Sequence, residues 1–172
     1  RQVHQRFPDD ADIAMLYVES MMDLRPWGYW MLDGQPYEGT TEIVALTEEV
    51  LRRNPKHPGA LHMYIHLIES TSTPERAEKA ADTLLTLMPA AGHMIHMSSH
   101  IYQRVGRYAD SMKSNQLAIA ADEDYITRKV CIRWCTIRTI SIFFGLQLAW
   151  MVRARLPSNL HAKLPVKLMM QC

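Results

Sequence analysis

The feature that most constrains the fold of this chain is an internal repeat with a period of about 34 residues. A repeat of this length is a single supersecondary unit that cannot bury its apolar face alone, so neighbouring units must stack. We therefore predict an all-α protein, built as an α-α superhelix of stacked antiparallel helix pairs. Shifting the sequence by one period superimposes Pro55 on Pro89, Leu61 on Ile95, His62 on His96, His66 on His100, and Leu67 on Ile101.

Each repeat unit is expected to contain two helices. The unit 55–88 reads as "PGALHMYIHLIES" followed by "TPERAEKAADTLLTLMP", and the unit 89–122 as "AGHMIHMSSHIYQRVG" followed by "RYADSMKSNQLAIAA". Thr73 before Pro74 is the pattern of an N-cap with proline at the first helical position. Gly106 lies where a helix is expected to end. These boundaries predict four helices between residues 55 and 122.

Residues at fixed places in the two units carry a family signature. Both units begin at a proline, and the run "IYQRVGRYADS" has aromatic, glycine and aromatic residues at Tyr102, Gly106 and Tyr108. In these positions, and in Ala77 and Ala118, the chain resembles the tetratricopeptide repeat family over residues 55–122. The resemblance implies that the first helices of successive units lie side by side and line a concave groove. It departs from the family pattern at Ile65, Ser111 and Glu123.

An earlier unit, residues 9–54, fits the pattern more loosely. Pro8 would close a preceding repeat, "DADIAMLYVESMMDL" would be the first helix, and "TTEIVALTEEVLRRNP" its partner. The segment between these two helices makes this unit longer than the other two, so we predict a long loop at 25–40. This loop is rich in tryptophan and tyrosine. It is either a packed connection between the helices or a cover over a ligand.

Five of the eight histidines fall on the faces that this register turns toward the groove. His62 and His66 are one helical turn apart, while His93, His96 and His100 follow the i, i+3, i+7 spacing of one helix face. Because neighbouring helix axes lie about 8 to 10 Å apart, these side chains can meet. The same face continues into polar and charged residues. The candidate groove residues are therefore His62, His66, Glu69, His93, His96, His100, Gln103 and Arg104, with Glu19 and Asp23 at equivalent places in the first unit.

Three interpretations of this histidine cluster stay open. The rings are hydrogen-bonded at a helix interface, they line a binding site for a protein, a peptide or a small polar ligand, or they hold a metal ion. Neutral imidazole suits Zn, Cu, Fe or Ni, and the predicted metal ligands are His62, His66, His96 and His100. In that case Glu69 or Glu19 would complete the shell or act as a base toward bound water in a metal-dependent enzyme. The sequence "HMYIH" lacks the glutamate of HExxH, which disfavours a metalloprotease.

Composition excludes some classes of function. Residues 1–124 carry 11 basic and 18 acidic groups, a net charge of −7, so no nucleic-acid partner is expected. The longest apolar run, "TISIFFGLQLAWMV", is shorter than the span of about 20 residues that a transmembrane helix needs. No cysteine occurs before Cys131, so a disulfide framework is not expected.

We expect a soluble protein, cytoplasmic rather than secreted. The chain opens at Arg1 with no initiator methionine and no charged-then-apolar leader, so we expect a fragment or a processed product rather than a complete precursor.

The tail, residues 125–172, differs from the repeats. It is basic and apolar, it carries all three cysteines, and it contains no acidic residue. One hypothesis is that this segment is translated out of frame, since a one-nucleotide shift of permitted codons can restore a sequence that resembles a further repeat helix. The alternative is a genuine C-terminal helix that caps the last repeat or lies on a membrane surface.

Overall fold

The computed structural model describes residues 1–128, and this part of the chain contains helices and no strand. The all-α prediction is therefore confirmed for the described residues. After Arg128 the predicted tail lies outside them, and so do both interpretations of it. The elements are α1 (Gln2–Arg6), α2 (Ala11–Asp23), α3 (Thr40–Arg53), α4 (Pro58–Ile68), the 3-10 helix η1 (Pro74–Ala77), α5 (Glu78–Leu87), α6 (Gly92–Arg104) and α7 (Tyr108–Arg128).

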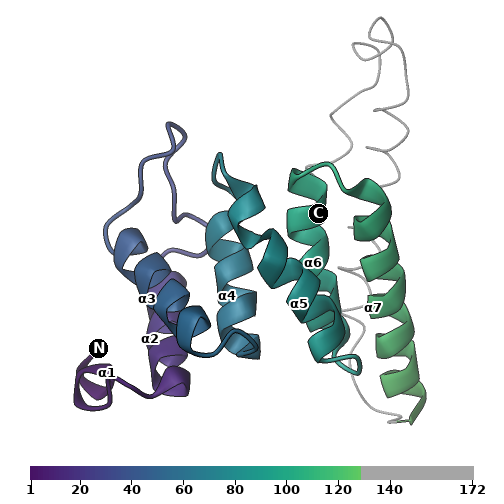
Figure 1. Ribbon diagram of the computed structural model, residues 1–172, viewed down its shortest axis with the longest axis horizontal. Helices are drawn as coiled ribbons and strands as arrows, with labels where there is room; N and C mark the ends of the chain where they lie inside the picture. The colour runs from purple at the N-terminus through teal and green to yellow at the C-terminus, as the bar shows by residue number, and fades with distance from the viewer. Residues whose placement is uncertain (129–172) are drawn as a thin grey trace, which may run out of the picture.

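The helices α2 to α7 follow one another across the molecule and alternate in direction (Figure 1). Each one packs against the next along the chain. In addition α2 contacts α4, and α4 contacts α6, although another helix separates each of these pairs in the sequence. The first helices of the three predicted units therefore lie beside one another, which brings the histidines of α4 next to those of α6.

Local capping explains where several helices begin and end. The Asp10 carboxylate accepts a hydrogen bond from the Ile13 backbone N–H at 3.0 Å and caps α2. His57 does the same for α4, because its Nδ1 accepts from the Ala60 N–H at 3.2 Å. Gly106 has a φ of +83° in the turn between α6 and α7, a conformation that glycine adopts without steric cost.

The predicted N-cap at Thr73 is only partly correct. Thr73 precedes Pro74, but its side chain makes no capping hydrogen bond. The chain instead forms the 3-10 helix η1 before α5 begins. The Thr73 backbone N–H donates to the Thr71 hydroxyl at 3.3 Å. The nearby hydroxyl offers the Thr73 backbone a local partner, and the first turn is tighter than an α-helix.

The long segment between α2 and α3 packs onto the end of α4. The Trp30 indole N–H donates to the Leu67 carbonyl oxygen at 2.7 Å, which satisfies one of the last carbonyls of that helix. Tyr29 is buried, and its carbonyl oxygen accepts from the Thr40 hydroxyl at 2.8 Å. Trp27, in contrast, is 74% exposed. The loop is thus anchored through Tyr29 and Trp30 and presents the indole of Trp27 to solvent.

A shared apolar core runs through α2 to α6. Its fully buried side chains include Val18 of α2, Ile65 of α4, Leu84 of α5, and Met97 and Ile101 of α6. Within residues 1–128, no helix is long and apolar enough to cross a membrane. The apolar faces of α4 and α6 pack in this core. Their other faces, which carry the histidines, therefore point away from it.

Candidate functional site: a histidine network on α4 and α6

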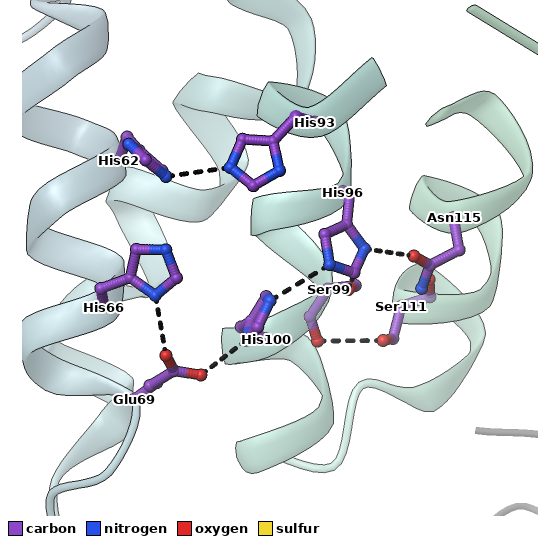
Figure 2. A network of polar contacts seen from close by, with 9 residues as sticks. All are labelled: His62, His66, Glu69, His93, His96, Ser99, His100, Ser111 and Asn115. Carbon is purple, nitrogen blue, oxygen red and sulfur yellow. Dashed lines mark hydrogen bonds and ion pairs between the residues drawn. The ribbon is translucent and has the colours of Figure 1, made fainter. Parts of the chain in front are cut away.

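The five histidines of the predicted groove lie together on two adjacent helices (Figure 2). His62 and His66 come from α4, and their ring centroids are 4.9 Å apart. His93, His96 and His100 come from α6. Between the two helices, the ring centroids of His62 and His93 are 5.1 Å apart, and those of His66 and His100 are 5.6 Å apart. We call these five rings the histidine network.

Glu69, directly after α4, connects the two helices through its carboxylate. Its Oε1 accepts from His66 Nδ1 at 2.9 Å, and its Oε2 accepts from His100 Nδ1 at 2.6 Å. Burial alone would raise the pKa of Glu69, but these two hydrogen bonds outweigh it and hold the pKa at about 2. At neutral pH the carboxylate is therefore ionised and fixes one nitrogen of each ring.

His96 is the most buried ring of the network, at 3% exposure. Its Nδ1 lies 2.7 Å from the Asn115 Oδ1 on α7. The amide nitrogen of Asn115 donates to the Ser111 carbonyl oxygen at 2.9 Å, so the orientation of the amide is settled. His96 Nδ1 must therefore carry a proton and donate it. Sequence reasoning did not select Asn115, although Ser111, Asn115 and Ala118 recur at helical spacing on the buried face of α7.

Two other rings, His66 and His100, carry their proton on Nδ1 for the same reason. His66 Nδ1 and His100 Nδ1 both face an ionised carboxylate, so both donate. In the neutral state their Nε2 atoms are then acceptors. His100 Nε2 lies 3.2 Å from His96 Nε2. This contact between two acceptor nitrogens is attractive when a proton or another cation is shared between them.

Burial lowers the pKa of three rings of the network, His62, His93 and His96. It is the main cause that lowers the pKa of His62 to about 3, and the neighbouring rings of His66 and His93 act in the same direction. Burial also lowers the pKa of His96 to about 4, although the hydrogen bond to Asn115 partly opposes it. The surface of His93 is exposed, but partial desolvation of its ring and the neighbouring rings of His66 and His100 lower its pKa as well. At neutral pH these three imidazoles are uncharged, which is the state that binds metal ions.

One ring nitrogen each from His62, His66 and His93 lie within 4.8 Å of one another. This triad shares two residues with the predicted metal set of His62, His66, His96 and His100. Among the described residues it is the group whose geometry suits a metal ion. His96 and His100 instead direct their Nδ1 atoms to Asn115 and Glu69.

A pocket of about 530 Å³ opens beside the network. It is lined by residues from the 25–40 loop, from the end of α4 and from the end of α6. This brings the predicted Gln103 and Arg104 together with His66, His100 and the carboxylate that bridges them. The lining residues are Trp27, Tyr29, His66, Glu69, Ser70, His100, Gln103 and Arg104.

The two acidic candidates on α2 lie elsewhere. Glu19 is exposed and lines a separate pocket with His57 and Met63. Asp23 is exposed too, and its charge acts on the buried Tyr29, whose pKa is raised chiefly by burial and further by the charges of Glu69 and Asp23. Within the described part of the chain, α2 borders α4 and is not in extensive contact with α6, so these two carboxylates stand apart from the network.

Comparison with known proteins adds no further assignment. No protein-family model matches the chain, and neither the curated proteins nor the solved structures include a match.

Proposed function

We propose that residues 9–122 form a tetratricopeptide-like superhelix that binds a peptide or a small polar molecule in the pocket beside the histidine network. The period of the sequence repeat and the contacts of α2 with α4 and of α4 with α6 support the array. Ser111, which departs from the family pattern, is buried, and its hydroxyl donates to the Ser99 carbonyl oxygen at 3.0 Å. Ser111 is thus still a small residue, and its hydroxyl adds a hydrogen bond between α6 and α7.

The observation that carries the binding proposal is the composition of the pocket. Three segments that are distant in the sequence supply aromatic, acidic, basic and amide groups to one cavity of about 530 Å³. This volume is within the range of about 300 to 1,000 Å³ that small-molecule sites occupy. A ligand there meets the indole of Trp27, the carboxylate of Glu69 and the guanidinium of Arg104. These groups suit a ligand with one flat or apolar part and polar ends.

Trp27 gives a second line of support. It has a φ of +57°, a left-handed conformation that is strained for a bulky side chain and costs on the order of 1–3 kcal/mol. Its side chain is 74% exposed, so little packing compensates for the strain. Strained residues that persist without packing gather at binding sites, where the rest of the structure holds them in place. We interpret Trp27 as an aromatic contact at the mouth of the pocket.

The test is a screen of the full chain against a phage-displayed random peptide library and a set of small carboxylates, amines and amides. Selected peptides or fragments should bind with a Kd at least about 10-fold higher when Trp27→Ala or Gln103→Ala is introduced, which corresponds to about 1.4 kcal/mol. The matched control is Lys79→Ala, which lies in another pocket of about 530 Å³ formed by α3, α4 and α5 residues. A screen that returns no binder, or binders that lose affinity only in Lys79→Ala, would contradict the proposal.

A further inference from the structure

We infer that His62, His66 and His93 hold one divalent transition-metal ion of the zinc type. This site is distinct from the ligand pocket, although His66 belongs to both. The inference does not depend on what the pocket binds. It rests on ligand geometry and on the support of the ligands by neighbouring groups.

The distances between the rings match those across a metal ion. The Nε2 atoms of His62 and His93 are 3.2 Å apart. Two imidazole nitrogens bound to one tetrahedral zinc ion at about 2.0–2.1 Å would be separated by about 3.3–3.4 Å. A nitrogen of His66 lies within 4.8 Å of both. The three nitrogens are therefore close enough for small side-chain shifts to bring them onto one ion.

The backbones that carry the three ligands are held firmly. His62 and His66 are one turn apart on α4, and the residues between and beside them, Leu61 and Ile65, are in the core. His93 is in the first turn of α6, next to Gly92, which is so close to α7 that an added Cβ would meet the Ala118 carbonyl oxygen at 2.7 Å. The separation of the two ligand-bearing helices is fixed by packing on either side.

Glu69 orients one of the proposed ligands, His66. It fixes His66 through Nδ1, which leaves Nε2 to face a metal ion and makes the ring a stronger ligand. A carboxylate, histidine and metal arranged in this way are a common feature of metal sites, and loss of the outer carboxylate lowers metal affinity by about 10- to 100-fold. The second oxygen of Glu69 is bonded to His100, so the carboxylate is itself held in place.

The ligand set indicates the class of metal. Three imidazoles without a thiolate favour zinc, copper, nickel or ferrous iron over calcium or magnesium, which prefer oxygen ligands. Three protein ligands also leave a fourth position for water or for another ligand. Because His66 lines the pocket as well, a polar group of a ligand bound there is close to this position.

The competing explanation needs no metal. A single N–H···N hydrogen bond between His62 and His93 accounts for their 3.2 Å contact. A different metal position would lie between His96 and His100, whose Nε2 atoms are again 3.2 Å apart. Zinc binding itself distinguishes the metal-free case, and single substitutions distinguish the two metal positions, because only the proposed position depends on His93.

The experiment is zinc titration of the full chain by isothermal calorimetry. The protein is prepared without a polyhistidine tag, and Cys131→Ser, Cys135→Ser and Cys172→Ser remove thiols that would also bind zinc. We expect one Zn²⁺ per chain. The variants His66→Ala and His93→Ala should lose it, while His4→Ala, which changes a histidine outside the network, should retain it. Far-UV circular dichroism confirms that each variant is folded, and the exposure of His93 makes this variant the safer of the two.

A second variant tests the supporting role of Glu69. Glu69→Gln should keep the stoichiometry of one but weaken zinc binding by about 10- to 100-fold. The inference is overturned if the parent binds no zinc, if folded His93→Ala binds zinc as tightly as the parent, or if His96→Ala and His100→Ala remove the metal while His93→Ala keeps it. The peptide and fragment screen is performed without added metal and with a chelator, so failure of either proposal is recognised separately.

Discussion

Acidification should destabilise this protein because His96 is buried in the neutral form. Burial lowers its pKa from the ordinary value of 6.5 to about 4 in the folded protein. In the unfolded chain the ring recovers a pKa of about 6.5, so the unfolded state binds more protons between these two values. The contribution of His96 to stability is therefore complete above pH 6.5 and is lost as the pH falls toward 4.

The size of the effect follows from the two pKa values. Between pH 7.5 and pH 5, a shift from 6.5 to about 4 lowers the free energy of unfolding by about 2 kcal/mol. His62, whose pKa is about 3, changes stability in the same direction. Glu69 acts in a separate window, because its pKa falls from 4.5 to about 2 on folding and its contribution is lost only below about pH 4.5.

The assay is urea unfolding of the full chain at pH 7.5 and pH 5, followed by circular dichroism. With a slope of about 2 kcal/mol per M, the loss of about 2 kcal/mol that depends on His96 moves the midpoint down by about 1 M, in addition to the shift that His62 causes. His96→Gln removes the titrating ring but keeps an amide N–H that can donate to Asn115, and its midpoint should move clearly less. Equal midpoints at the two pH values in the parent, or an unchanged shift in His96→Gln, would refute this reasoning.

Three further substitutions test the packing around the site. Gly92→Ala should lower the free energy of unfolding by about 1–3 kcal/mol, because the new methyl group would collide with Asp122 and with the α7 backbone. Gly59→Ala, also in the first turn of a helix, meets its nearest atom at 3.4 Å and should change stability by less than about 0.5 kcal/mol. Trp30→Phe should cost about 1 kcal/mol by removing the hydrogen bond to Leu67, and thermal unfolding monitors all three. Equal losses in the two glycine variants, or a neutral Trp30→Phe, would contradict the packing described.

Periodicity was a good guide to the helices and to the shared faces of the histidines. The spacing of His62 and His66, and of His93, His96 and His100, depends only on the helical period, which is a local property of the chain. The adjacency of α4 and α6 follows from the stacking of repeat units. Both the spacing and the stacking can be read from the sequence, and together they predict that the five rings lie close together.

The partners of each nitrogen could not be predicted in the same way. Whether His93 or His96 approaches His62 depends on the crossing angle between packed helices and on side-chain rotamers, which the periodic pattern does not encode. Asn115 is on the second helix of its unit. From the periodic pattern alone, its face of this helix is recognised only by its small, buried residues. The 25–40 loop is an insertion outside the repeat, so its strained Trp27 and its contact with α4 follow from tertiary packing alone.

The most direct test of the account is the protonation state of the network in solution. Long-range ¹H–¹⁵N spectra of the full chain at pH 7.5, with the histidine side chains assigned, report which ring nitrogen carries the proton. We expect Nδ1–H tautomers for His66, His96 and His100, because each Nδ1 faces the oxygen of Glu69 or Asn115. Nε2–H tautomers at these three rings, with the averaged shifts of solvated imidazole, would contradict the network and the metal site that Glu69 supports.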